Sequence, residues 1–289
     1  MVQMNQQGEH LTQPTVVKYV EQRSSGVRSQ YYTRNAVGYV VQGTKYIHSG
    51  DQRQCLHKGD IFFLGIGLHY TEELPEGDRP YEQIVFYYNP DELQRILLHL
   101  NITYRLNISN NHHCPTCRTS SEVTMPAWSA IRGIFLGAAQ YLQGEQAPDR
   151  TAENFKMTEL IYHIVSHEDC CLKSKILGSI DTNQENFEQI VYGHIFSECS
   201  IEELARKTHR SLTSFKKEFR RIYAMPPHKW FIRQRLVHSR LLLISTSKSV
   251  SEIGLQCSFP NTSHFIKLFK KAYGHTPSSY RTVHRAEVA

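Results

Sequence analysis

The sequence lacks a long apolar run, an apolar leader and an even set of cysteines. No stretch approaches the roughly 20 consecutive apolar residues that a membrane-spanning helix needs. The opening residues, MVQMNQQGEHLTQPT, are polar and show no charged-then-apolar order. Seven scattered cysteines are an odd number, which fits a reducing compartment better than a disulfide framework. We therefore expect a cytoplasmic protein with no membrane partner.

Positive charge is scarce in most of the chain and concentrated in its last third. Residues 184–289 hold 17 Lys and Arg against 8 Asp and Glu, a net charge of +9. Residues 1–183 hold the remaining 16 and 19, a net charge of −3. A chain of 289 residues is long enough for two domains. The asymmetry indicates a polyanion-binding module attached to a second domain, although a basic domain that is merely soluble would show the same charge.

The basic third contains an internal repeat, displaced by about 50 residues. Upstream, SIEELARKT (200–208) matches SVSEIGLQC (249–257). Downstream, two phenylalanines, a proline and an aromatic residue recur: Phe215, Phe219, Pro227 and Trp230, then Phe265, Phe269, Pro277 and Tyr280. Each copy predicts a capped helix, a tight turn and a longer basic helix. The strongly helical stretch 228–245 lies between the copies and would set their separation.

The outer faces of the two longer helices carry small polar and cationic side chains. A helix–turn–helix unit can place such a helix in the major groove, with short side chains near base edges and cations on phosphates. One such pattern is often an ordinary helical hairpin, but two copies with the same Phe-x3-Phe interior argue against that alternative. The predicted DNA-binding residues are Thr213, Ser214, Lys216, Lys217, Arg220, Arg221, Thr262, Ser263, His264, Lys267, Lys270 and Lys271.

This C-terminal third resembles the AraC/XylS family of transcription regulators. The stretch IGLQCSFPNTSHFIKLFKKAYGHTPSSYR (253–281) is close to the family pattern I-A-x-x-x-G-F…S-x-F-x-x-x-F-K-x-x-x-G-x-x-P-x-x-Y-R, and LARKTHRSLTSFKKEFRRIYAMPPHKW resembles its first motif. The sequence departs from the pattern at four positions. His209 and Ser258 replace turn glycines, Ala224 replaces the glycine after the first long helix, and Gly254 replaces an alanine. The resemblance implies base-reading positions at Thr213, Lys216, Lys217, Thr262, Ser263, His264 and Lys267.

Residues 37–89 alternate in polarity and contain turn signals, which predicts several short strands in a small β-barrel or sandwich. The stretch CLHKGDIFFLGIGLHYTEE resembles the cupin-like effector domain of the AraC regulators. A metal-dependent cupin enzyme would need a His-x-His motif, which the chain lacks. We therefore predict no enzyme, no catalytic residues and no cofactor. Aromatic residues on strands more often form plain core, but the candidate effector-pocket residues are Tyr39, Tyr46, Phe62, His69 and Tyr88.

The stretch NHHCPTCR (111–118) places four soft metal ligands close together: His112, His113, Cys114 and Cys117. A Cys-x2-Cys pair suits tetrahedral zinc or a redox couple. The sequence shows no second, distant pair, so we favour a plain surface loop over either site. We give Cys170 and Cys171, which neighbour each other further along the chain, no role.

The remaining elements complete an α+β prediction. Residues 126–144 and 153–167 predict a helical hairpin, which in the resembled family makes a dimer and otherwise packs on the barrel. We expect a cupin-like sensing and dimerisation domain at 1–168, a linker at 169–184, and an all-α domain at 185–285 with two helix–turn–helix units joined by a linker helix.

The predicted function is sequence-specific transcription regulation, more often activation within the resembled family. The predicted partners are double-stranded promoter DNA, RNA polymerase, a second copy of the chain, and a small-molecule effector or a protein partner. A cupin-type enzyme with a basic appendage is the alternative from another class, and the missing ligand motif argues against it.

Overall fold

The computed structural model describes residues 15–49, 52–112, 114, 122–142, 149–180 and 182–285. Its N-terminal half is built on two antiparallel sheets, with strand orders β1-β8-β3-β6-β9 and β2-β7-β4-β5. The strands are β1 (Val16–Glu21), β2 (Arg28–Tyr32), β3 (Asn35–Gln42), β4 (Thr44–Ser49), β5 (Gln52–Leu56), β6 (Asp60–Leu64), β7 (Gly67–Leu74), β8 (Tyr81–Tyr88) and β9 (Glu122–Pro126). The predicted small β-domain thus has a double-sheet form.

The two sheets face each other across a shared apolar core. Inward-pointing side chains of both sheets meet there, among them Val40 and Val85 of the larger sheet and Ile47 and Leu56 of the smaller one. Successive side chains point to opposite faces of a strand, so β4 alternates in burial, whereas β3 of the larger sheet is buried on both faces. Gly38 of β3 lies opposite Phe62 of β6 in the larger sheet, and a Cβ at Gly38 would lie 2.0 Å from the ring of Phe62, so this ring packs over the glycine.

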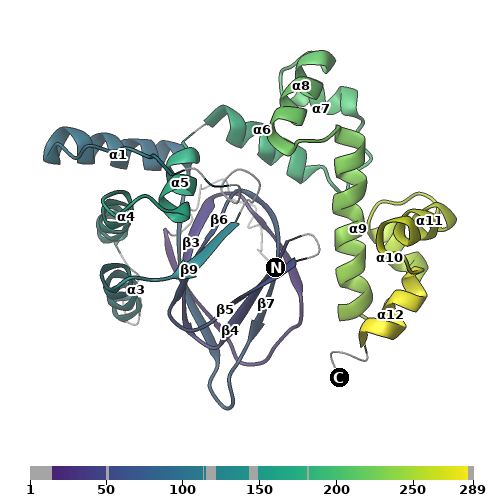
Figure 1. Cartoon of the computed structure of the whole chain (residues 1–289), viewed down its shortest axis with the longest axis horizontal. Coiled ribbons are helices and arrows are strands. Elements are labelled where there is room, and N and C mark those ends of the chain that lie inside the picture. The colour runs from purple at the N-terminus through teal and green to yellow at the C-terminus, as the bar shows by residue number, and fades with distance from the viewer. Residues whose placement is uncertain are drawn as a thin grey trace, which may run out of the picture.

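Four helices cover the outer face of the larger sheet (Figure 1). They are α1 (Pro90–Tyr104), α3 (Ser129–Tyr141), α4 (Arg150–Val165) and α5 (Cys171–Gly178). Helix α1 begins with a capping box between Asn89 and Glu92. The predicted helical hairpin is present as α3 and α4, which bury Ile131, Phe135 and Leu160 in this layer.

The segment expected to be a linker, 169–184, is partly core. Residues 171–178 form α5, and its Leu172 and Ile176 are completely buried against the larger sheet and its helices. Two apolar residues four positions apart are enough to bury one face of this short helix, so the stretch expected as a linker contributes to the core of the N-terminal half.

The C-terminal half is helical and contains both predicted helix–turn–helix units. Its helices are α6 (Thr182–Gly193), α7 (Ile201–Lys207), α8 (Leu212–Tyr223), α9 (Pro227–Ser245), α10 (Val250–Gln256), α11 (Thr262–Tyr273) and α12 (Pro277–Arg285). The first half of α9 packs in the core of the first unit with α7 and α8. Its second half packs in the core of the second unit with α10 and α11. The repeat and its connecting helix are confirmed.

The helical half lies against the outer face of the smaller sheet, opposite the four covering helices (Figure 1). Tyr70 of β7 packs there with Val237 and Leu241 of α9. Gly67 leaves room for the ring of Tyr192 on α6, because a Cβ at Gly67 would lie 3.0 Å from that ring. No described helix is long and apolar enough to cross a membrane.

Candidate nucleic-acid interface and the buried polar network

Both long helices of the repeat are capped at each end by local interactions. The side chain of Ser211 accepts a hydrogen bond from the backbone N–H of Ser214, and that of Asn261 accepts one from His264. Capping boxes at Ser200 and Ser249 begin the two shorter helices, α7 and α10. These caps satisfy backbone donors that a helix start leaves unpaired, so the sequence defines both units locally.

The inner faces of α8 and α11 are fully buried, as predicted. Phe215 and Phe219 in the first unit and Phe265 and Phe269 in the second have no exposed surface. In the second unit, a Cβ at Gly254 would lie 3.1 Å from the ring of Phe265. Glycine at this position, where the family pattern has alanine, avoids this close contact.

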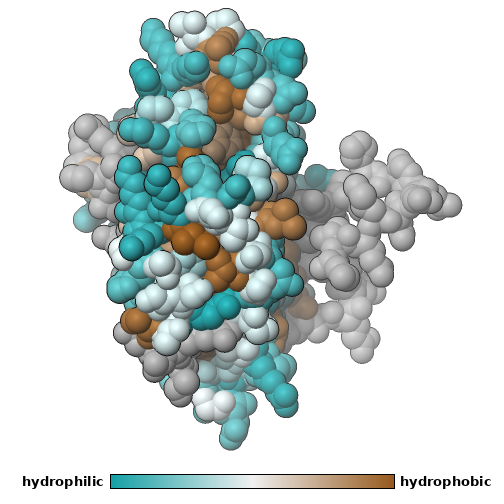
Figure 2. Space-filling view, turned by 90° about the vertical axis from the view of Figure 1, so that its right-hand side faces the viewer, coloured by the Kyte–Doolittle hydropathy of each residue, from teal (hydrophilic) through white to brown (hydrophobic). Residues whose placement is uncertain are grey.

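The outer faces of α8 and α11 carry the predicted DNA-binding side chains in two separate groups. Thr213, Ser214, Lys216, Lys217, Arg220 and Arg221 lie exposed on α8, and Thr262, Ser263, His264, Lys267, Lys270 and Lys271 lie on α11, of which Thr262 alone is half-buried. Arg221 also pairs with Glu218 at 2.8 Å, so part of its charge is balanced within the helix. Figure 2 shows the side of the molecule beyond α9, where hydrophilic side chains predominate and apolar patches are small and separate.

One arginine that the sequence analysis missed joins the two units. Arg235 of α9 donates from Nε to the carbonyl of Ile195 at 2.6 Å and from a terminal nitrogen to that of Ser197 at 2.8 Å. Its other terminal nitrogen donates to the carbonyl of Ser258 in the turn of the second unit at 2.9 Å. The hydroxyl of Ser258 in turn donates to the carbonyl of Phe196 at 2.6 Å. These bonds hold the second turn against the connection between α6 and α7, just ahead of the first unit, and fix the relative orientation of the two units.

The five predicted effector-pocket residues lie on different faces of the β-domain. Tyr39 and Tyr88 point into the core beneath the helices, and the ring of Tyr39 stacks on Phe135 at 5.3 Å. Phe62 points between the sheets. His69 is buried beside Tyr32, with Nε2 2.7 Å from the carbonyl of Gly65. Tyr46 is half-buried under the guanidinium of Arg53. Only Phe62 and His69 border the shared interior of the two sheets.

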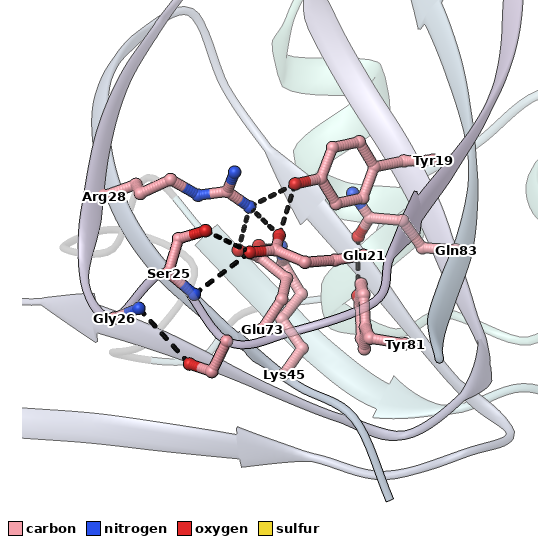
Figure 3. A network of polar contacts seen from close by, with 10 residues as sticks. Tyr19, Glu21, Ser25, Gly26, Arg28, Lys45, Glu73, Tyr81 and Gln83 are labelled. Atoms are coloured by element: carbon pink, nitrogen blue, oxygen red, sulfur yellow. Dashed lines mark hydrogen bonds and ion pairs between the residues drawn. The ribbon is translucent and has the colours of Figure 1, made fainter. Parts of the chain in front are cut away.

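A buried polar network occupies that interior (Figure 3). The ammonium of Lys45 is completely buried, bonds to Glu73, and lies 5.2 Å from the ring centroid of Phe62. Glu73 also accepts a hydrogen bond from Arg28 at 2.8 Å. Arg28 further bonds to Glu21 and Tyr19. The side chains are progressively more buried from Arg28, 40% exposed, to Lys45, 0% exposed, so the network runs from the surface into the interior.

Burial and pairing act against each other on the charges of this network. Burial, the largest influence, lowers the pKa of Lys45, while the carboxylate of Glu73 acts in the opposite direction. Burial would raise the pKa of Glu73, but Lys45 and Arg28 outweigh it and the pKa is lowered. An anionic ligand could replace Glu73 beside Lys45 without leaving a buried cation unpaired. A sequence signal for these residues existed, because Lys45 and Glu73 are in phase with the inward-pointing Ile47 and Thr71.

The predicted His and Cys cluster is only partly within the described residues. His113 and Cys117 lie outside them, whereas His112 and Cys114 follow α1. The structure adds Cys171, which the sequence analysis gave no role: its Sγ lies 3.3 Å from Nε2 of His112 and 3.6 Å from Sγ of Cys114. The distant cysteine that the sequence alone could not pair with this loop is therefore supplied by α5.

Comparison with known proteins agrees with this architecture in both halves. Residues 204–282 match the helix-turn-helix domain family, and residues 35–170 match the ExsA N-terminal regulatory domain. The chain belongs to the AraC/XylS family. The curated relatives of this AraC/XylS protein are transcription regulators, which agrees with the prediction that it is not an enzyme.

Two relatives and one solved structure illustrate the extent of the similarity to other AraC/XylS proteins. The regulator ExsA of Pseudomonas aeruginosa is 22% identical over 160 residues, 55% of this chain and 57% of ExsA. The virulence regulon transcriptional activator VirF of Yersinia enterocolitica is 24% identical over 98 residues, 34% of this chain and 36% of VirF. These matches thus span about half or less of the relatives' lengths. The crystal structure of an apo ToxT variant from Vibrio cholerae shares the fold, with a TM-score of 0.51, 10% identity and coverage of 93% of this chain and 98% of that chain.

Proposed function

We propose that this chain is a sequence-specific DNA-binding transcription regulator that acts as an activator. The observation that carries the proposal is the pair of capped, oriented helices α8 and α11, each with an apolar inner face and a polar, cationic outer face. Short side chains near the start of each helix suit base edges, and the lysines and arginines further along suit phosphates.

The separation of the two helices supports binding to one face of the DNA. Helix α9 has 19 residues and joins the units, which at 1.5 Å per residue makes it about 28 Å long. This length is comparable to the roughly 34 Å of one turn of DNA. Because Arg235 holds both units together, we expect α8 and α11 to enter successive major grooves as one rigid reader.

The N-terminal unit is proposed to sense a signal and to change the DNA affinity of the C-terminal unit. A signal can do this only by binding the DNA-competent and incompetent arrangements with different affinity. The contact of Tyr70 with Val237 and Leu241 offers a direct route, because it joins β7 to the helix that spaces the two units.

The signal is proposed to be a small molecule or a protein partner, and a specific observation supports the first. The Lys45–Glu73 pair lies between the sheets and connects to the surface through Arg28. Mass spectrometry of the purified full chain would distinguish the two cases. A co-purifying anion that is lost in Lys45→Met would support a small-molecule effector, and a stoichiometric protein would support a partner.

A homodimer is proposed to form through the helical layer on the other side of the β-domain. Apolar side chains are exposed there on α3 and α4: Leu136 is 43% exposed, Phe155 72% and Tyr162 40%. These helices are far from the DNA-binding units (Figure 1). RNA polymerase contact and a cytoplasmic location are proposed from the regulator function. Light scattering should give a dimer mass for the native chain and a monomer mass for Phe155→Glu.

Selection of binding sites from a random DNA pool tests the central part of the proposal. The full chain should enrich one bipartite site whose halves lie about one helical turn apart. The affinity for this site should fall as the salt concentration rises, because binding releases the counterions condensed on the DNA phosphates. A pool that shows salt-sensitive binding without any enriched sequence would contradict sequence-specific regulation. A double variant, Lys217→Ala with Lys267→Ala, serves as the control for the two reading helices.

A further inference from the structure

Three soft metal-ligand side chains from distant parts of the chain meet at one place beside the helical layer. His112 and Cys114 belong to the connection that follows α1, and Cys171 is the first residue of α5. Their ligand atoms all lie within 4.8 Å of one another, and all three side chains are half-buried. The cluster is separate from the DNA-binding helices and from the polar network between the sheets.

The separations of these atoms match those around a tetrahedral zinc ion. With Zn–S near 2.3 Å and Zn–N near 2.1 Å, tetrahedral angles put two sulfurs about 3.8 Å apart and a sulfur and a nitrogen about 3.6 Å apart. The observed separations are 3.6 Å between the sulfurs of Cys114 and Cys171 and 3.3 Å between Cys171 and Nε2 of His112. A disulfide would bring the two sulfurs to about 2.05 Å. These two separations are therefore close to those around zinc, and the sulfurs are too far apart for a disulfide.

The backbone around the cluster is held in place by other bonds. The backbone N–H of Asn111 donates to Asp169 at 3.0 Å, and the side chain of Asn110 donates to the hydroxyl of Ser174 at 3.3 Å. Lys173, almost fully buried, pairs with the same Asp169 at 2.9 Å. These contacts position the His112 segment on α5 without any ion, so the ligands do not have to be gathered by metal binding.

We propose that His112, Cys114 and Cys171 form a zinc-binding site. Thiolate and imidazole ligands select zinc among the abundant divalent ions, whereas magnesium and calcium prefer oxygen ligands. A tetrahedral ion takes one further donor beside these three.

The site would act as a clamp on α5. Helix α5 packs Leu172 and Ile176 into the core and is followed along the chain by α6, the first helix of the C-terminal half. Zinc at Cys171 would tie the start of α5 to the segment after α1. Loss of zinc would make α5, which leads from the N-terminal half to the C-terminal half, less firmly held. This inference does not depend on the proposed DNA-binding function.

Metal analysis of the full chain, purified under reducing conditions without chelators, tests the proposal. We expect about one zinc ion per chain, because the three protein ligands already lie together in the folded state. Replacing zinc with Co²⁺ should give the visible bands of a tetrahedral ion and the near-ultraviolet band of thiolate-to-cobalt charge transfer. A wild-type chain without zinc, and without these bands when Co²⁺ is added, would overturn the proposal whether or not any variant folds.

Substitutions then assign the ligands. Cys114→Ser and Cys171→Ser should each lower the zinc content and weaken the charge-transfer band, and His112→Ala should lower zinc affinity by at least tenfold. Cys170→Ser is the matched control, since it alters the neighbouring thiol at the same helix start, and it should keep its zinc. Equal losses in Cys170→Ser, or a Cys114–Cys171 disulfide in zinc-free wild type purified under reducing conditions, would contradict the assignment.

Discussion

The left-handed backbone at the end of α8 gives a sharp test of how the two units are built. Ala224 has a φ of 54°, in the region that favours glycine, and its counterpart at the end of α11 is Gly274 with a φ of 77°. An L-residue in this region costs about 1–2 kcal/mol. Replacing alanine by glycine also adds about 0.4–1 kcal/mol of backbone entropy to the unfolded chain. The relief of backbone strain exceeds this entropic cost, so Ala224→Gly should stabilise the first unit by about 0.5–1 kcal/mol.

Gly274→Ala is the matched change of opposite sign. A Cβ added at Gly274 would have no heavy atom within 4 Å, so the change alters only the backbone. It should destabilise the second unit by about 1 kcal/mol. In both variants the N–H at the cap can keep its bond to the carbonyl of Arg220 or Lys270.

Urea unfolding of the full chain, followed by tryptophan fluorescence, measures these effects. Trp230 lies in the core of the first unit, so a Trp128→Phe background leaves its signal to report on that unit. Ala224→Gly should move the Trp230 transition to higher urea without changing its slope. A shift to lower urea would refute the argument, because it would show that Ala224 contributes more than its backbone strain costs.

The other predictions concern DNA contacts, the join between the units and pH. Lys217→Ala and Lys267→Ala should each weaken specific DNA binding by about 1–3 kcal/mol in titrations at fixed salt, and equal losses on random DNA would reduce both to phosphate contacts. Arg235→Lys should lower the free energy of unfolding of the C-terminal half by about 2 kcal/mol in urea titrations, because three carbonyls lose guanidinium donors, and unchanged stability would mean that water replaces them. Burial lowers the pKa of His238 from 6.5 to about 4, so the ring stays neutral in the fold while the unfolded chain takes up a proton. The unfolding free energy should therefore fall by up to about 3 kcal/mol between pH 6.5 and 4, and His238→Phe should flatten this dependence in urea titrations at each pH.

The C-terminal half could be predicted closely from the sequence because its signals are local. The N-caps Ser200 and Asn261, the phenylalanines four residues apart and Gly274 all act within one or two helical turns. The turn residues His209 and Ser258 were noted as departures from glycine, and the structure shows both in the left-handed region, with φ of 54° and 57°. The turns keep their shape without glycine. Ser258 is also held by its bonds to Phe196 and Arg235.

Features that depend on long-range packing could not be predicted. Cys171 is 57 residues from Cys114 and lies in a stretch whose polar residues conceal the buried Leu172 and Ile176. Arg235 looked like one more cation on a basic helix, because the carbonyls it binds are 38, 40 and 23 residues away. The aromatic residues of the strands were assigned to a pocket by type alone. Without the pairing of the strands, the sequence could not show that Tyr39 and Phe62 point to opposite sides of the larger sheet.

The most direct test of whether α8 and α11 bind DNA as one rigid pair is a change in half-site spacing. About 5 base pairs inserted between the two halves of a selected site turn one half-site to the opposite face of the DNA. The full chain should then bind the altered site no more tightly than it binds a single half-site, because α9 and Arg235 fix the separation and rotation of α8 and α11. Affinity that is unchanged by the insertion would contradict a rigid pair of reading helices.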